Sequence, residues 1–255
     1  MTDKPILFSG PMVRALLDGR KTQTRRVLKR HVLHKPEPHS ITYQDGTLIC
    51  RWRSGIRHDL PSPYAIGDRL WVREAWATVN SGSGPGWAYR ADSGFVQPDY
   101  DGEDFGAGPS FNYDKYPGEY CMWFSDLLAG EPGHPWRPSI HMPRWASRLT
   151  LIVTDVRVQR VQEISADDAR AEGVQPVYDP ASDTGDPAYM NYQKTGEAFA
   201  GLGAARLSFM TLWDSLNAPR GYGWDVNPWV AAYTFSIHRQ NIDQMTDTLQ
   251  QMRTT

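Results

Sequence analysis

The stretch that decides the fold of this chain runs from Gly19 to Arg26 and reads GRKTQTRR. It follows a short apolar segment, Val13 to Leu17, whose composition is typical of a helix. Gly19 is a natural end for that helix, because glycine adopts the left-handed conformation that closes helices. The sequence therefore predicts a helix that stops at Gly19 and a polar segment directly after it.

The polar segment brings several reactive side-chain types close together. If the chain is extended there, Thr22, Thr24 and Arg26 share one face of a strand, and Lys21 lies at its base. A hydroxyl nucleophile, an amine that deprotonates it and a fixed cation for an oxyanion are the parts of an acyl-transfer site. The alternative is a solvated basic turn after a helix.

Four residues of this segment match a family signature. Gly19, Lys21, Thr24 and Arg26 fit the pattern G-x-K-x-x-[E/T]-x-R, and the chain thereby resembles ASCH domains, a PUA-like β-barrel family linked to RNA and modified nucleosides. The form with threonine resembles the small bacterial N4-acetylcytidine amidohydrolases, whose catalytic trio is a lysine, a threonine and a later glutamate.

Three further segments follow the order of that family. The segment 67–72, GDRLWV, resembles a G-D-x-L-x-V strand, 165–173 resembles the glutamate-bearing helix, and 228–237 resembles the closing strand. Matching the helix residue by residue places Ala169 on a family alanine and the glutamate at Glu172. The whole chain also resembles ASCH-like proteins of phages and prophages, although the matched core covers less than half of its length.

The resemblance implies an α+β fold, a PUA-like ASCH β-barrel with flanking helices and long loop insertions. We expect one elaborated domain over residues 1–255. The insertions are expected at about 28–63, 78–143 and 175–203, followed by a helical tail at 240–255.

The resemblance also implies a reaction, the removal of an acyl group from N4 of cytidine or a related nucleoside. Thr24 would be the nucleophile, Lys21 its base and Glu172 the assisting acid, with Arg26 supporting the site and no metal or other cofactor. An ordinary lysine is a poor base, so burial or Arg26 must lower the pKa of Lys21, whereas an ion pair with Glu172 would raise it. The alternative for the Lys21–Glu172 pair is a plain salt bridge across a pocket mouth. The alternative functions are a phage-derived module that binds RNA or a modified base without converting it, and a ribonuclease.

Other side chains are candidates for substrate binding. Aromatic rings stack on bases, and charges can point into a pocket. Aromatics in a β-rich core mostly serve packing, however, and the charges of Arg73 and Glu74 are equally expected to pair across strands on the outside. The candidates are Trp71, Arg73, Glu74, Trp76, Tyr89 and Trp145.

Composition limits the partners. The chain has 255 residues, 40% of them hydrophobic, with a net charge of −2, which argues against tight binding to long nucleic acid but not against a nucleoside or a short single strand. Two distant cysteines, Cys50 and Cys121, make a disulfide framework or a cysteine zinc site improbable and favour the cytoplasm.

The start of the chain lacks a signal-peptide pattern, and no apolar run reaches membrane-span length. The histidines at 31, 34, 39 and 58 have no recognised ligand spacing and read as solvated side chains.

Periodicity and turn residues predict the remaining elements. Helices are expected at 11–18, 165–171 and 204–216, with a polar helical tail at 240–252. A hairpin turning at Asp45-Gly46 is expected between strands at 41–43 and 47–53. Further strands are expected at 6–8, 70–76, 87–89, 120–124, 148–161 and 229–237.

Overall fold

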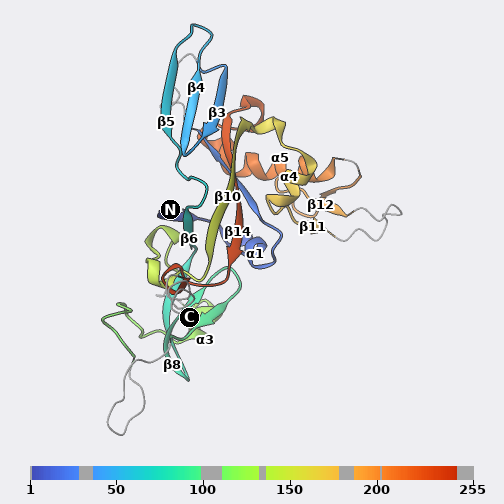
Figure 1. Ribbon diagram of the computed structural model, residues 1–255. Coiled ribbons are helices and arrows are strands. Elements are labelled where there is room, and N and C mark those ends of the chain that lie inside the picture. The colour runs from blue at the N-terminus through green and yellow to red at the C-terminus, as the bar shows by residue number, and fades with distance from the viewer. Residues whose placement is uncertain are drawn as a thin grey trace, which may run out of the picture. The chain divides into compact units, whose positions relative to one another are not determined.

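The computed structural model describes residues 2–28, 37–98, 111–131, 136–177, 187–201 and 203–245. Within these ranges the chain has a mixed α+β architecture with mostly strands and few helices (Figure 1). The helices are α1 (Gly10–Leu17), α3 (Phe124–Ala129), α4 (Ala166–Ala171) and α5 (Ala204–Asn217). None of the helices in these ranges is both long and apolar enough to cross a bilayer.

The largest sheet contains five strands in the order β1-β6-β10-β14-β2. Their bounds are β1 (Asp3–Leu7), β2 (Gln23–Val27), β6 (Arg69–Arg73), β10 (Thr150–Arg160) and β14 (Trp229–His238). The two long strands β10 and β14 lie side by side in the middle (Figure 1). Over the described residues β1 and β2 are unjoined edges, so the sheet is open.

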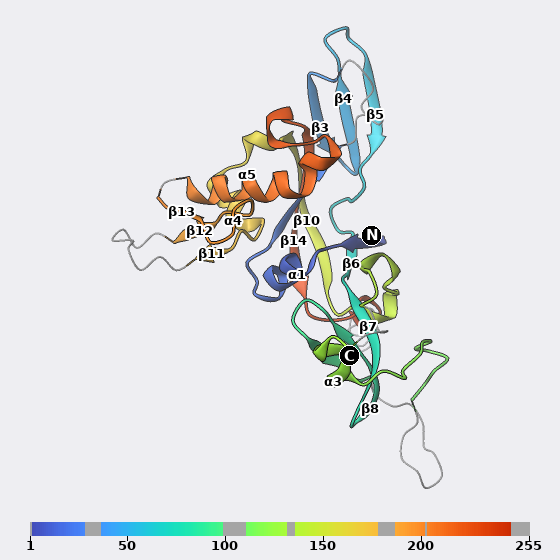
Figure 2. The ribbon, with the colours of Figure 1, turned by 180° about the vertical axis from the view of Figure 1, so that it is seen from behind.

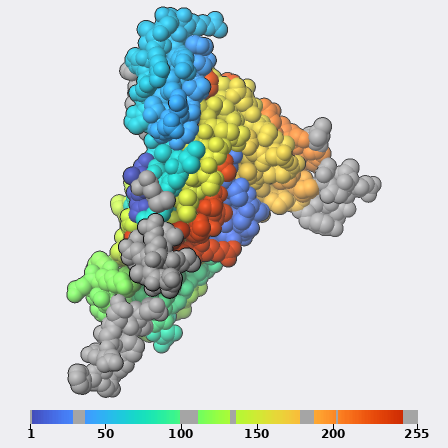
Figure 3. All heavy atoms as spheres, in the orientation of Figure 1, coloured from blue at the N-terminus to red at the C-terminus, as the bar shows by residue number. Residues whose placement is uncertain are grey.

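Each of the three expected insertions contains a small antiparallel sheet rather than only loops. Their strands are β3 (Ser40–Gln44), β4 (Thr47–Arg51), β5 (Arg57–Pro61), β7 (Trp76–Ser81), β8 (Gly84–Tyr89), β9 (Gly94–Val96), β11 (Pro176–Val177), β12 (Ala188–Met190) and β13 (Ala198–Phe199). The first of these sheets, β3-β4-β5, forms one continuous blue surface in Figure 3. Its tip confirms the predicted hairpin, because Asp45 and Gly46 both have positive φ, 46° and 82°, as a tight type I′ turn requires.

Contacts within the chain group it into two compact units. Unit 1 comprises Met1–Lys4, Ala15–Arg69 and Leu151–His238, and unit 2 comprises Pro5–Arg14, Leu70–Thr150 and Arg239–Thr255. The expectation of one elaborated domain stays a prediction. In unit 1, α4 and α5 pack on each other, and α5 also contacts β12 and β13 (Figure 2).

Each unit has its own apolar core. In unit 1, Leu151 and Val153 of β10 and Val230 and Tyr233 of β14 are almost fully buried. The core of unit 2 is aromatic, with a buried cluster made by Trp76, Trp87, Tyr89, Met142 and Ala146. Alternation accounts for the burial of Leu151 and Val153 in β10, whereas β14 is buried on both faces over Val230–Tyr233 because it lies inside the sheet between β10 and β2.

Most predicted elements are confirmed, including helices α1, α4 and α5 and strands β8, β10 and β14. The strand expected at 70–76 is instead divided into β6 and β7, because the backbone N–H of Glu74 points to the sulfur of Met142, 3.3 Å away, rather than into the sheet. Its alternation nevertheless holds, since Leu70, Val72, Glu74 and Trp76 are all buried.

The prediction of a strand at 120–124 is wrong. Tyr120 and Met122 are buried and Trp123 is 52% exposed, so side chains alternate as in a strand. The backbone, however, makes only an isolated bridge between Asn80 and Trp123 before α3 begins at Phe124. Of the predicted tail, one short helical segment at 242–245 is seen, and residues 246–255 lie outside the described ranges.

Candidate functional site

The polar segment after α1 is held in place by its backbone. Gly19 has φ of 73° and its N–H donates to the carbonyl of Leu16 at 3.0 Å, which closes the helix as predicted. The N–H of Lys21 donates to the carbonyl of Ala15 at 3.0 Å, and that of Thr22 donates to Ala171 of α4 at 2.8 Å. The segment is therefore tied both to its own helix and to the end of α4.

The residue that caps the C-terminal end of helix α4 lies against Lys21. Ser165 caps the helix by accepting from the N–H of Asp168 at 3.0 Å, and Glu172 is the C-terminal cap. Gly173 follows with φ of 84°, and a Cβ atom there would lie 2.8 Å from the Cβ of Lys21. Glycine is required at this position both for its conformation and for the close approach of Lys21.

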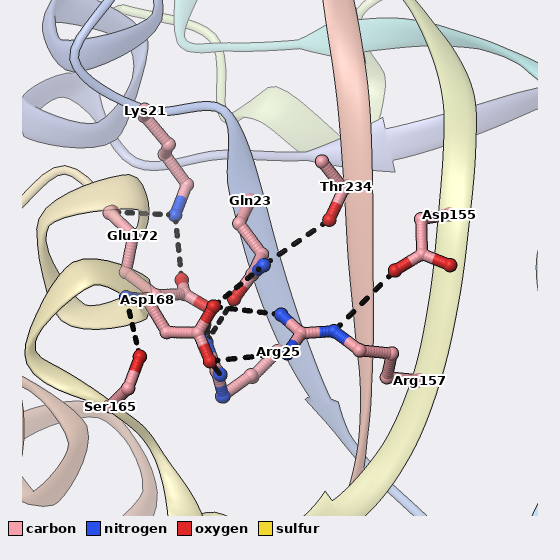
Figure 4. A network of polar contacts seen from close by, with 9 residues as sticks. All are labelled: Lys21, Gln23, Arg25, Asp155, Arg157, Ser165, Asp168, Glu172 and Thr234. Carbon is pink, nitrogen blue, oxygen red and sulfur yellow. Dashed lines mark hydrogen bonds and ion pairs between the residues drawn. The ribbon is translucent and has the colours of Figure 1, made fainter.

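Lys21 and Glu172 form a buried ion pair. The ammonium Nζ lies 2.9 Å from Oε2 of Glu172 and also donates to the Glu172 carbonyl at 2.8 Å (Figure 4). The two residues are only 2% and 4% exposed. The structure therefore brings together the predicted base and the predicted glutamate, which are 151 positions apart in sequence.

A second buried cation shares the same carboxylate. Arg25 places Nη1 3.0 Å from Oε1 of Glu172 and Nη2 3.0 Å from Oδ2 of Asp168, and its side chain has no exposed area. Gln23 joins the network through Asp168 and through Thr234 of β14 (Figure 4). Sequence reasoning missed Arg25, although alternation along β2 places it on the same face as Lys21 and Gln23.

The position of Lys21 lowers its pKa. Burial is the largest cause, because it disfavours the charged ammonium. The charge of Glu172 and its hydrogen bond act in the opposite direction, and the positive charges of Arg26 and Arg25 add to the lowering. The sequence left open whether the pKa of Lys21 is raised or lowered. Burial and the two arginines together lower it.

Thr24 and Arg26 lie on the other face of β2. Thr24 is opposite Tyr233 and Arg26 opposite Ala231 in the pairing of β2 with β14. Thr24 is 5% exposed, and no hydrogen bond joins its hydroxyl to Lys21 or Glu172 in the described part of the chain. Burial lowers the pKa of Arg26, against the opposing influence of Tyr64, Glu172 and Tyr233.

The six candidate substrate-binding residues belong to unit 2, whereas Lys21, Thr24, Arg26 and Glu172 belong to unit 1. Glu74 is 1% exposed and forms a two-pronged ion pair with Arg148 at 2.8 and 2.9 Å. Arg73 donates to the carbonyl of Ile140 and lies over the ring of Trp71 at 5.2 Å. The charged side chains of Glu74 and Arg73 therefore both have partners within the protein.

The other aromatic candidates belong to the core of unit 2. Trp76 is 2% and Tyr89 1% exposed, and the Tyr89 hydroxyl donates to the carbonyl of Ala146 at 2.7 Å. Trp145 is partly buried and packs against the same cluster. Trp76 and Tyr89 therefore contribute packing, while Trp145 retains accessible surface.

No group of three or more His, Cys, Asp or Glu side chains within the described ranges is arranged to hold a metal ion. Of the histidines considered above, those at 31 and 34 lie outside those ranges, and His39 and His58 are exposed. Both cysteines are free thiols.

Comparisons with protein-family models, with curated proteins and with solved structures find no match to this chain.

Proposed function

We propose that this protein is a metal-independent amidohydrolase that removes an acyl group from N4 of cytidine or a related modified nucleoside. The observation that carries the proposal is the buried Lys21–Glu172 pair, in which burial lowers the pKa of the lysine. A lysine with a lowered pKa is suited to act as a general base near neutral pH. The match of Gly19, Lys21, Thr24 and Arg26 to the ASCH signature selects the substrate class.

The proposed reaction has two balanced steps. The Thr24 hydroxyl attacks the acyl carbon while neutral Lys21 accepts its proton. The C–N bond to cytosine then breaks as protonated Lys21 returns that proton to the leaving amine, directly or by way of the Glu172 carboxylate. Water then hydrolyses the acyl-threonine ester and releases the carboxylic acid. Since Thr24 lies on the opposite face of β2 from Gln23 and Arg25, the proposed mechanism requires a change in this segment when substrate binds, so that the hydroxyl and the amine come within reach.

The test is an absorbance assay on N4-acetylcytidine with the purified protein. We expect Lys21→Ala, Thr24→Ala and Glu172→Ala each to lower kcat/KM by roughly 10²- to 10⁴-fold, the range for a lost proton-transfer group. Asp167→Asn is the matched control, because Asp167 is on the same helix as the network and its side chain is 93% exposed. Full activity in Thr24→Ala would show that the threonine mechanism is wrong.

A second candidate is a module that binds a modified base or RNA without converting it. The observation in its favour is that Thr24 lies on the opposite face of β2 from Gln23 and Arg25, the residues that join the Glu172 network. This candidate predicts saturable binding of acylated cytidines with unchanged ligand. RNA fragmentation that survives Thr24→Ala would indicate a ribonuclease instead.

The ASCH-like barrel and a cytoplasmic location belong to the same proposal. The position of Glu172 at the end of α4, as expected for the glutamate-bearing helix, supports the family resemblance from which the barrel is proposed. Two free thiols, Cys50 and Cys121, support the cytoplasmic location, since disulfides are rare in the cytoplasm.

A further inference from the structure

Strand β14 carries a hydroxyl–imidazole pair near its C-terminal end, outside the site described above. The Oγ atom of Ser236 lies 3.1 Å from Nε2 of His238. The two residues are two positions apart in a strand, so their side chains stand on the same face of the sheet. The distance is within the range over which a serine and the base that accepts its proton act together.

The pair lies where β14 extends past β2. The pairing of β2 with β14 covers Val230 to Thr234, and Ser236 and His238 come after it. Ser236 is exposed and His238 is half-buried. A small molecule can therefore reach the Ser236 hydroxyl from solvent, whereas Thr24, within the paired part of the strands, is only 5% exposed.

The partner of the Ser236 hydroxyl distinguishes it from several other serines of the chain. Some serine hydroxyls donate to main-chain carbonyls, which do not take up a proton near neutral pH. These are Ser81, Ser147, Ser208 and Ser215. Ser125 donates to the carboxylate of Asp126 at 3.1 Å, and a carboxylate is ordinarily a weaker base than an imidazole. When Nδ1 of His238 carries the ring hydrogen, Nε2 accepts from the Ser236 hydroxyl and can take its proton.

We propose that Ser236 is a nucleophile, activated by His238, that accepts the acyl group of small aryl esters of carboxylic acids. The bond from Oγ to the acyl carbon forms as the bond between that carbon and the aryl oxygen breaks, and the electron pair of the broken bond leaves with the phenolate. The hydroxyl proton passes to Nε2 of His238 and from there to water. Water then adds to the acyl-serine, the carboxylic acid departs and Ser236 is regenerated.

The two side chains fit this substrate class because they supply one nucleophile and one base. The leaving group of an aryl ester departs as a phenolate anion, so no acid is needed to protonate it. An amide or an alkyl ester would require such an acid. The activity goes beyond the function proposed above and uses none of its residues. Thr24 is opposite Tyr233, three positions before Ser236, and therefore lies on the other face of the sheet.

The test is the reaction of the full chain with p-nitrophenyl acetate. Absorbance follows the release of p-nitrophenolate, and peptide mass spectrometry locates the acetyl group. We expect a burst of about one p-nitrophenolate per chain and an acetyl group on Ser236. His238→Gln should slow acetylation of Ser236 by about 100-fold, the lower end of the range for a lost general base, and Ser236→Ala should abolish the burst.

Ser125 is the matched control, because it is an exposed serine whose hydroxyl lies at the same distance, 3.1 Å, from a carboxylate instead of an imidazole. Ser125→Ala should leave the burst unchanged. The reaction is repeated in Thr24→Ala, which removes the nucleophile of the proposed amide hydrolysis. An acetyl group found on Ser236 in that variant cannot have passed through Thr24.

Three outcomes would overturn the proposal. These are the absence of an acetyl group on Ser236, acetylation of Ser236 that is as fast in His238→Gln as in the unaltered protein, or acetylation of Ser125 at the same rate as Ser236. The last comparison is made within the unaltered protein, so it holds even if a variant is less stable. Turnover of N4-acetylcytidine is measured separately, so failure of one proposal is distinguishable from failure of the other.

Discussion

Two charge clusters, one in each unit and each built around a buried glutamate, use nearly the same residue types with opposite consequences. The lysine cluster of unit 1 comprises Lys21, Arg25, Glu172 and Asp168. The Arg148 cluster of unit 2 comprises Arg148, Glu74 and Asp92, with Arg148 2.8 Å from an oxygen of each carboxylate. In the first cluster two cations share the carboxylate of Glu172, and in the second two carboxylates share one cation.

The way in which the charges are shared determines whether the pKa of the buried cation falls, as for Lys21, or rises, as for Arg148. Burial lowers the pKa of Lys21, and Arg26 and Arg25 add to that effect while Glu172 opposes it. Burial acts on Arg148 in the same direction, but the bonds to Glu74 and Asp92 outweigh it and raise the pKa of Arg148. The first arrangement suits proton transfer and the second suits structure, because an arginine does not release its proton in proteins.

Replacement of Arg25 is expected to have the largest effect. Arg25→Gln leaves Glu172 and Asp168 with less compensation, so the free energy of unfolding should fall by about 3–5 kcal/mol. The pKa of Lys21 should rise, because a positive neighbour is lost and Glu172 pairs with Lys21 alone. The rising limb of kcat/KM with pH should therefore move to higher pH.

The Lys21 pKa can also be read directly by NMR titration of ¹³Cε-labelled lysine, which does not require activity. Arg25→Lys, which keeps the charge, should restore part of the lowering. An unchanged Lys21 signal in Arg25→Gln would contradict the shared-carboxylate explanation.

Replacement of Glu74 should affect stability alone. Glu74→Ala removes one of two acids from Arg148, and we expect a loss of about 3 kcal/mol in the free energy of unfolding. Asp92 remains to pair with Arg148, so the loss falls at the lower end of the range for a broken buried pair. Urea unfolding measures the change. A shift in the pH dependence of turnover in Glu74→Ala would contradict the view that the Arg148 cluster contributes only to stability.

Gly173→Ala should disturb the lysine cluster through the backbone. A left-handed conformation costs a non-glycine residue about 1–2 kcal/mol, and the new methyl group would meet the Cβ of Lys21 at 2.8 Å. We expect lower stability together with reduced kcat, since Lys21 must shift away from Glu172. Gly221→Ala is the matched control, with φ of 79° and nothing within 4 Å of an added Cβ. Equal losses in the two variants would mean that the contact with Lys21 contributes nothing.

Arg157→Gln should have the smallest effect. Arg157 pairs with Asp168 at 2.7 Å, but its side chain is 43% exposed, so the pair contributes less than about 1 kcal/mol. The pH dependence of turnover and the NMR titration of Lys21 should stay unchanged. A shift comparable to that of Arg25→Gln would show that the outer charges of the network, and not the buried arginine alone, set the lysine pKa.

Local signals were sufficient for much of the fold. Gly19 and Gly173 end their helices with positive φ, Ser165 caps α4, and Asp45-Gly46 turns a hairpin. These features were predictable because capping and turn chemistry act over a few residues. The predicted strand at 120–124 is absent because a strand needs a neighbouring strand to pair with, which the local sequence does not reveal. The alternating burial there comes from packing against neighbouring segments.

The candidate site was only partly predictable. The ASCH signature and the helix at 165–171 indicated Lys21 and Glu172, and the structure brings both together. Arg25 is not part of the family signature, and its position on the same face as Lys21 does not by itself indicate that it reaches a carboxylate 147 positions away. The aromatic candidates Trp76 and Tyr89 were ambiguous from the start, since stacking on a base and packing in a core require the same residue types.

The sequence by itself determined the helix ends, the hairpin, the existence of strands β10 and β14 and the pairing candidates Lys21 and Glu172. Only the tertiary structure decided that Arg25 shares the Glu172 carboxylate across 147 positions of chain, and that Arg148 is shared by two acids instead. The physical reason is that propensities and caps depend on neighbours along the chain. The charge state of a buried group depends on which side chains packing brings within about 4 Å of it and on how far water is excluded.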